Sequence, residues 1–127
     1  INLIVNVEKD FYLRGIENEF QQVVLNILNN AKEAIVERKK TSSNIRVDVS
    51  VDNEQGVISI TDDAGGIPEE IIKDVFKLEY TTKPNGNGIG LYLVQKIAVQ
   101  RFMGTIEVNN ADSGACFTLT FNADKGE

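Results

Sequence analysis

The sequence predicts an α+β fold, a two-layer α/β sandwich in which helices cover one face of a sheet. Three segments alternate apolar and polar residues as half-buried strands do, and two more flank a turn as a hairpin does. Two others carry apolar residues at helical spacing, and a short helix is expected after a proline. Their order is strand, helix, two strands, short helix, loop, helix, two strands. We therefore expect a mixed, mostly antiparallel sheet of about five strands under three helices, with residues 1–127 forming a single domain.

The first half of the chain contains the longest predicted helix. Leu3–Val7 is predicted to be a strand because it alternates apolar and polar positions. Glu17–Lys40 is predicted to be a helix, because its apolar residues recur with a period of about 3.6. Ile45–Val51 and Val57–Asp62 alternate on either side of a polar stretch and predict a β-hairpin.

The second half contains two helices and a second hairpin. Glu69–Phe76 is predicted to be a short helix because a proline, which the first helical turn tolerates, precedes it. The polar segment Tyr80–Asn87 contains Pro and Gly and is predicted to be a loop. Apolar residues at helical spacing predict a helix over Gly88–Phe102. Thr105–Asn109 and Ala115–Phe121 predict a closing hairpin.

The composition excludes several classes of function. The net charge of −6 argues against a general nucleic-acid surface, which needs clustered Lys and Arg. The chain has no histidine, which excludes a His-based triad, a His metal cluster and a phosphoacceptor histidine within it. The single cysteine, Cys116, cannot form an internal disulfide and suits a reducing compartment. No apolar run is long enough to span a membrane, and the first residue, Ile1, suggests a piece of a longer protein.

Polar residues border the apolar stripe of the long helix. Asn30 lies roughly 20° outside the stripe, Asn26 is one turn earlier on the same side, and Glu33 is nearby. Asparagine is a poor helix former, so two of them at the rim of a buried face are typical of a pocket wall. The carbonyl oxygen of Asn30 suits Mg²⁺, which prefers hard oxygen ligands beside phosphates. The alternative is that both asparagines only border the core.

Asp62 is predicted to point into the core at the end of a strand. Ile58, Ile60 and Asp62 share one strand face, and the two isoleucines are core candidates. A buried carboxylate needs hydrogen-bond donors, and the exocyclic amino group of adenine would be one. The small, flexible residues that follow, at 64–66, allow backbone to lie against a flat ring. The alternative is that the acidic pair and its glycines only form a turn.

Gly86–Leu91 directly precedes a predicted helix and is a candidate anion site, because free N–H groups and the positive helix end favour phosphate there. It is not a Rossmann fingerprint, because Leu91 takes the place of the third glycine, and it lacks the Gly-Lys-Ser/Thr of a P-loop. Upstream, Lys83 follows Thr81 and Thr82 and could reach a terminal phosphate. The alternatives are a plain glycine-rich helix entry and a solvated loop lysine.

In order and spacing, these motifs resemble the boxes of sensor histidine kinases over nearly the whole chain. In chain order they are the N box (Asn26–Ala31), the first glycine box (Asp62–Ile67), the F box (Val75-Phe76 through Tyr80–Lys83), the second glycine box (Gly86–Leu91) and the closing hairpin (Met103–Ile106 and Gly114–Leu119).

The resemblance implies a Bergerat-type ATP-binding fold and transfer of the γ-phosphoryl group of Mg-ATP to a histidine on a separate dimerisation domain. It makes Asn30 the Mg²⁺ ligand and Asp62 the partner of the adenine amino group, with Gly66 beneath the ring. It gives catalytic roles to Asn26, Asn30 and Lys83. The other residues it implies at the nucleotide are Glu33, Ile67, Thr81, Thr82, Gly86, Asn87, Gly88, Ile89, Gly90, Leu91 and Thr118.

The resemblance also implies the setting of this domain. Its expected partners are the dimerisation and phosphoacceptor domain of the same parent protein and the receiver domain of a response regulator. We expect a cytoplasmic, monomeric domain with no direct contact to membrane or nucleic acid, whether or not the parent protein is anchored in a membrane.

Two other functions remain open at this stage. Related ATPases of the same fold carry a Glu one helical turn before the metal-binding Asn, where it activates water. Here that position is Asn26, which is not a base, so we expect slow hydrolysis at most. The other alternative is a degenerate, non-catalytic nucleotide-binding module. Its support is Ala64, which replaces the first glycine of the usual box and fits only at negative φ, and the short loop between Lys83 and Gly86.

Overall fold

In the computed structural model, the described residues are 2–11, 17–37, 43–67, 69–72, 74–76, 90–110 and 114–122. The helices and strands are β1 (Asn2–Val7), α1 (Glu17–Glu37), β2 (Asn44–Asp52), β3 (Gln55–Asp62), α2 (Glu69–Ile72), α3 (Gly90–Gln100), β4 (Thr105–Asn110) and β5 (Ala115–Asn122). All predicted strands are present, and the sequence pattern located their ends to within two residues.

The helices differ more from the prediction than the strands do. The described part of α1 ends at Glu37, and the predicted continuation to Lys40 lies outside the described residues. The helical part of the short predicted helix is the single turn α2. The helix α3 ends at Gln100 because Met103 takes a left-handed φ of 55° and the Gly104 N–H donates to the carbonyl of Ala98 at 2.8 Å.

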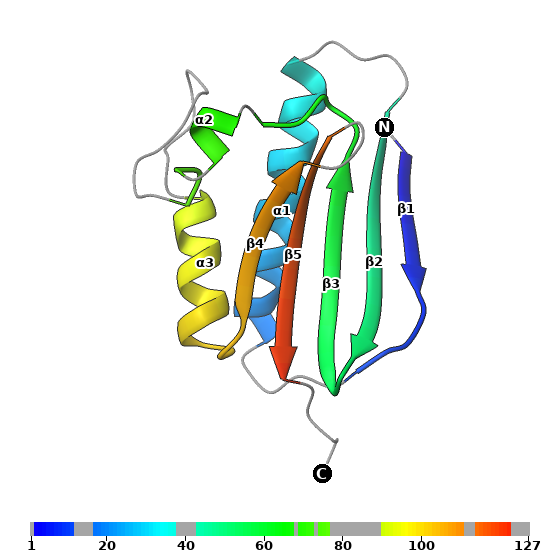
Figure 1. Ribbon diagram of the computed structural model, residues 1–127, viewed down its shortest axis with the longest axis vertical. Coiled ribbons are helices and arrows are strands. Elements are labelled where there is room, and N and C mark those ends of the chain that lie inside the picture. The colour runs from blue at the N-terminus through cyan, green and yellow to red at the C-terminus, as the bar shows by residue number, and fades with distance from the viewer. Residues whose placement is uncertain are drawn as a thin grey trace.

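The five strands form one sheet in the order β1-β2-β3-β5-β4. β1 runs parallel to β2, and every other neighbouring pair is antiparallel, which confirms the mixed sheet (Figure 1). The turn between β2 and β3 contains two residues with positive φ, Asn53 at 50° and Glu54 at 65°, as a two-residue hairpin turn requires.

The helices α1 and α3 cover one face of this sheet, which we call the inner face (Figure 1). Alternation turns Ile58 and Ile60 of β3 and Phe117 and Leu119 of β5 toward the helices, and none of the four is more than 7% exposed. From α1, Val23 and Ile27 enter the same core and are fully buried. A side chain of this kind contributes about 1.5–3 kcal/mol when it is buried, so this layer holds the sheet and helices together.

Aromatic rings close the core at the end of the sheet where α3 finishes. Phe20 of α1 meets Phe102 edge to face, with ring centroids 5.8 Å apart, and Phe121 of β5 contacts both rings at 6.1 Å. The helix layer stops short of β1, whose inner-face side chains Leu3 and Val5 remain 58% and 59% exposed. The packed core therefore lies under β3, β5 and β4 and extends to Ile45 of β2, which is 5% exposed, but it does not reach β1.

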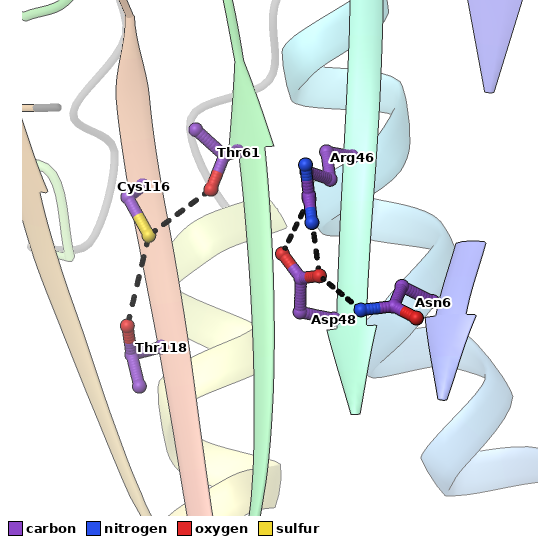
Figure 2. Close-up of polar contacts among 6 residues, drawn as sticks. All are labelled: Asn6, Arg46, Asp48, Thr61, Cys116 and Thr118. Carbon is purple, nitrogen blue, oxygen red and sulfur yellow. Dashed lines mark hydrogen bonds and ion pairs between the residues drawn. The ribbon is translucent and has the colours of Figure 1, made fainter. Parts of the chain in front are cut away.

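The outer face of the sheet is polar. Arg46 and Asp48 of β2 form an ion pair at 3.0 Å, and Asn6 of β1 donates a hydrogen bond to the same carboxylate (Figure 2). On the neighbouring strands, Thr61 donates to the Cys116 sulfur at 3.3 Å. Within the described ranges, each helix is either too short or too polar to cross a lipid bilayer.

Candidate functional site

The candidate site lies where β3 ends and the chain crosses the end of the sheet toward α2 (Figure 1). Asp62 is the last residue of β3, and residues 63–67 form an irregular segment, which we call the glycine loop. Gly65 and Gly66 have φ values of 96° and 86°. Residues with a Cβ rarely adopt this conformation, so the bend of the loop depends on two consecutive glycines.

Asp62 points inward as its strand position predicts, and it is 6% exposed. Its Oδ1 atom accepts hydrogen bonds from the backbone N–H groups of Ala64 at 3.0 Å and Ala115 at 3.2 Å. These donors offset the cost of burying the carboxylate. No described residue donates to its second oxygen, Oδ2, which leaves one carboxylate oxygen able to accept a hydrogen bond from a ligand.

Ala64 fits the loop without strain. It is absent from the three described non-glycine residues with positive φ, and its methyl group is buried in the core at 4% exposure. An alanine fits here only at negative φ, and Ala64 meets this condition. The backbone at this position does not need the positive φ that only a glycine would adopt readily, so alanine can replace the first glycine of the box.

Three separate strands hold Asp62 and the glycine loop in place. The Asp63 carboxylate accepts a hydrogen bond from the backbone N–H of Asn44, at the start of β2, at 3.0 Å. Ala115, at the start of β5, is tied to Asp62 as described above. The side chain of Asn110, at the end of β4, makes two hydrogen bonds of 2.7 Å to the backbone of Ile67.

Gly114 allows the closest of these approaches. A Cβ built at Gly114 would overlap the backbone carbonyl of Asp62 and lie 2.6 Å from its Oδ1 atom. Since real Cβ atoms do not come this close to backbone, the start of β5 can approach Asp62 only because residue 114 has no side chain. This approach puts the Ala115 N–H within reach of the carboxylate.

The other predicted residues that the structure describes come from the two helices and the loop. Asn26 and Asn30 of α1 are half-buried, as expected for the rim of the apolar stripe, whereas Glu33 is exposed. Ile67 and Leu91 are partly buried against the core. Gly90 is the first residue of α3. Phe76 of the F box meets Phe117 edge to face, with ring centroids 6.1 Å apart.

Thr118 lies on the other face of the sheet from the rest of the predicted site residues. Its neighbours Phe117 and Leu119 point into the core, so alternation turns Thr118 to the outer face. There its hydroxyl lies 3.8 Å from the sulfur of Cys116 (Figure 2). The remaining predicted residues lie outside the described residues: Thr81, Thr82, Lys83, Gly86, Asn87, Gly88 and Ile89.

Sequence reasoning did not identify Asn110, Gly114 or Ala115 as parts of the site. Ala115 appeared only as the first residue of a predicted strand and Gly114 only as the start of the closing-hairpin motif, and Asn110 lies just beyond the predicted strand Thr105–Asn109. One signal was available, because a glycine directly before a buried strand often marks close backbone approach. The partner of that approach depends on which strands are neighbours, and sequence periodicity does not contain that information.

Comparison with known proteins identifies the family. The family described as "Histidine kinase-, DNA gyrase B-, and HSP90-like ATPase" matches residues 15–125. The chain belongs to this family. Among curated members, sporulation kinase A of Bacillus subtilis is 28% identical over 116 residues, and the histidine-protein kinase AtoS of Escherichia coli is 41% identical over 101 residues.

These matches cover 90% and 78% of this chain, but only 18% of sporulation kinase A and 16% of AtoS. The chain therefore spans less than a fifth of the length of either kinase. Among solved structures, the nucleotide-free catalytic domain of the histidine kinase ThkA superposes with a TM-score of 0.84 at 24% identity. That match covers 95% of this chain and 78% of the ThkA chain, and it confirms the α+β sandwich of the family.

Proposed function

We propose that this chain binds Mg-ATP and acts as the catalytic domain of a two-component sensor histidine kinase, transferring the γ-phosphoryl group to a histidine on a separate dimerisation domain. The observation that carries the proposal is the buried carboxylate of Asp62, which keeps one oxygen for a ligand beside a bent glycine loop. Membership of the ATPase family and the names of the relatives support the same activity.

The adenine ring would lie against the glycine loop. The exocyclic amino group would donate to Oδ2 of Asp62, because Oδ1 is already held by two backbone N–H groups. The bend at Gly66, whose φ is 86°, would let the loop backbone lie against a flat ring, and Ile67 would offer an apolar contact at its edge. Oδ2 would favour adenine over a base with a carbonyl oxygen at the same position, because two facing acceptors repel each other.

The phosphates would lie toward α1 and the start of α3. We assign the Mg²⁺ ligand to the carbonyl oxygen of Asn30, with Asn26 and Glu33 on the same wall. The N–H groups of Gly90 and Leu91, at the start of α3, have no partner among the described residues of the helix and suit phosphate oxygens. From the segment outside the described residues, Lys83 and the threonines and glycines of 81–89 would complete the phosphate contacts.

Phosphotransfer to histidine fits this set of residues better than hydrolysis does. Asn26 cannot take a proton from water, whereas an imidazole acceptor is already a nucleophile. Catalysis would then consist of positioning the phosphates and neutralising their charge. As parts of the proposal, residues 1–127 form one monomeric cytoplasmic domain that acts on the dimerisation domain of its own parent protein. The phosphorylated dimerisation domain would then pass the phosphoryl group to the receiver domain of a response regulator.

Phosphorylation in trans tests the activity. Because this chain contains no histidine, we expect no phosphohistidine on it when it is mixed alone with Mg-ATP labelled at the γ-phosphate. With the parent protein's dimerisation domain added, acid-labile and base-stable label should appear on that partner. Label on the partner in the absence of this chain, or no label although this chain binds Mg-ATP, would contradict the proposal.

A metal role for Asn30 predicts a specific loss. Asn30→Ala should weaken binding of Mg-ATP by about tenfold or more, because even residues that only support a metal ligand change metal affinity by about 10- to 100-fold. Binding of ADP without Mg²⁺ should change much less. Calorimetric titration with and without Mg²⁺ measures both effects.

Asn29→Ala is the matched control, because Asn29 directly precedes Asn30 in the same helix and is exposed. It should bind both nucleotide forms like the wild type. Equal losses for Asn30→Ala with and without Mg²⁺ would remove the metal assignment and leave Asn30 as a residue that borders the core.

A further inference from the structure

Asn110 is an exposed residue whose side chain joins two parts of the chain that are far apart in sequence. It is the last residue of β4, and alternation with Ile106 and Val108 turns it to the inner face. Its Oδ1 accepts from the backbone N–H of Ile67 at 2.7 Å, and its Nδ2 donates to the backbone carbonyl of Ile67 at 2.7 Å. A weaker hydrogen bond at 3.4 Å joins Nδ2 to Glu69 in α2.

The two short hydrogen bonds satisfy both backbone groups of a single loop residue. A primary amide is the neutral group that offers an acceptor and a donor side by side, so it can pair with a peptide as another strand would. Aspartate has no donor for the Ile67 carbonyl, and alanine has neither group. The chemistry at residue 110 therefore matches the backbone of Ile67 in a way that few side chains can.

The same side chain also restricts Gly66. A Cβ built at Gly66 would lie 2.7 Å from the Oδ1 atom of Asn110, so the amide is packed directly over the second left-handed glycine. Glycine is the residue with the most conformational freedom, and two in succession leave the loop with many alternative paths. A side chain that contacts Gly66 and binds both groups of Ile67 selects one of these paths.

We infer that Asn110 is a positioning residue for the nucleotide site: its paired hydrogen bonds to Ile67 hold the glycine loop in the conformation that receives adenine. The inference rests on the function proposed above. Asn110 itself does not contact the nucleotide. It acts through Gly66 and Ile67, and without it the loop adopts the binding conformation for only a fraction of the time.

The effect on affinity should be larger than the effect on stability. Because Asn110 is exposed, water replaces its hydrogen bonds after truncation and no buried group is left unpaired. The apparent dissociation constant, by contrast, rises in inverse proportion to the fraction of molecules whose loop is competent. If that fraction falls to about a tenth, the affinity for adenine nucleotides falls about tenfold.

The test compares Asn110→Ala with Asn109→Ala, the matched control on the exposed outer face of the same strand. For Asn110→Ala we expect about a tenfold rise in the dissociation constant for ADP, unchanged by Mg²⁺, and a melting temperature within a few degrees of wild type. The Ile67 amide, measured by NMR hydrogen exchange, should exchange faster. Asn109→Ala should leave all three quantities unchanged.

Each contrary result has a distinct meaning. Faster exchange at Ile67 with unchanged ADP affinity would overturn the positioning role. A loss of affinity that follows the melting temperature, or that Asn109→Ala reproduces, would show a merely structural role and overturn it as well. If the wild type binds no adenine nucleotide, the proposed function fails first, and this inference fails with it.

Discussion

Asp62→Asn should lower the affinity for ATP and ADP alike, by about 10- to 150-fold, which corresponds to about 1.5–3 kcal/mol for a hydrogen bond to a charged group. The two backbone N–H groups of Ala64 and Ala115 would select the oxygen of the new amide. The amide nitrogen would then take the place of Oδ2 and face the amino group of adenine. Two donors would then face each other, where the proposed complex of the wild type pairs a donor with an acceptor.

The isosteric change makes this prediction specific to the ligand, because both backbone hydrogen bonds of Asp62 survive it. Calorimetric titration with ADP and with a non-hydrolysable ATP analogue measures the loss. Asp48→Asn is the control: it removes the same charge from the outer face, where Asp48 contacts Arg46 and Asn6 (Figure 2). Wild-type affinity in Asp62→Asn would exclude Asp62 from the nucleotide site.

The burial of Asp62 was predictable from the sequence because strands have a strict period of two. Once Ile58 and Ile60 were assigned to the core, Asp62 had to share their face, and all three are buried. The helix α1 was predictable for a similar reason, since its period of about 3.6 separates the buried Val23 and Ile27 from their polar neighbours. Local periodicity therefore determines which face a side chain occupies.

The partners of Asp62 and Ile67 were not predictable in this way. Ala115 lies 53 residues after Asp62, and Asn110 lies 43 residues after Ile67. Both contacts depend on the insertion of β5 between β3 and β4, which places the second hairpin beside the first. Periodicity within one strand says nothing about which other strand lies next to it, so the support of the site became visible only in the folded chain.

Thr118 shows the opposite case, in which a family resemblance and local periodicity disagree. The resemblance grouped Thr118 with the nucleotide-binding residues, whereas the alternation of β5 assigns it to the face opposite Phe117 and Leu119. The structure follows the alternation, because the two large apolar neighbours gain far more from burial than a threonine hydroxyl does. Our proposed site therefore leaves Thr118 out.

Gly114→Ala should reduce both stability and nucleotide affinity, because residue 114 is in contact with the backbone of Asp62. The added methyl group would push the start of β5 away from β3. Overpacking of this kind costs about 1–3 kcal/mol of unfolding free energy. The shift would also break the hydrogen bond from the Ala115 N–H to the Asp62 carboxylate, so we expect the affinity for ADP to fall about tenfold or more.

Gly104→Ala is the control that separates the loss of stability from the loss of nucleotide affinity. A Cβ at Gly104 would lie 2.5 Å from the Phe121 ring and 2.6 Å from the Thr120 carbonyl, so this variant is overpacked as well. Gly104 precedes β4, at the end of the sheet away from the glycine loop. Urea unfolding should therefore show a loss of stability in both variants. Titration with ADP at low temperature should show lost affinity only in Gly114→Ala, since only that change moves a group that holds Asp62. Equal affinities in the two variants would mean that the approach of β5 to Asp62 serves the fold alone.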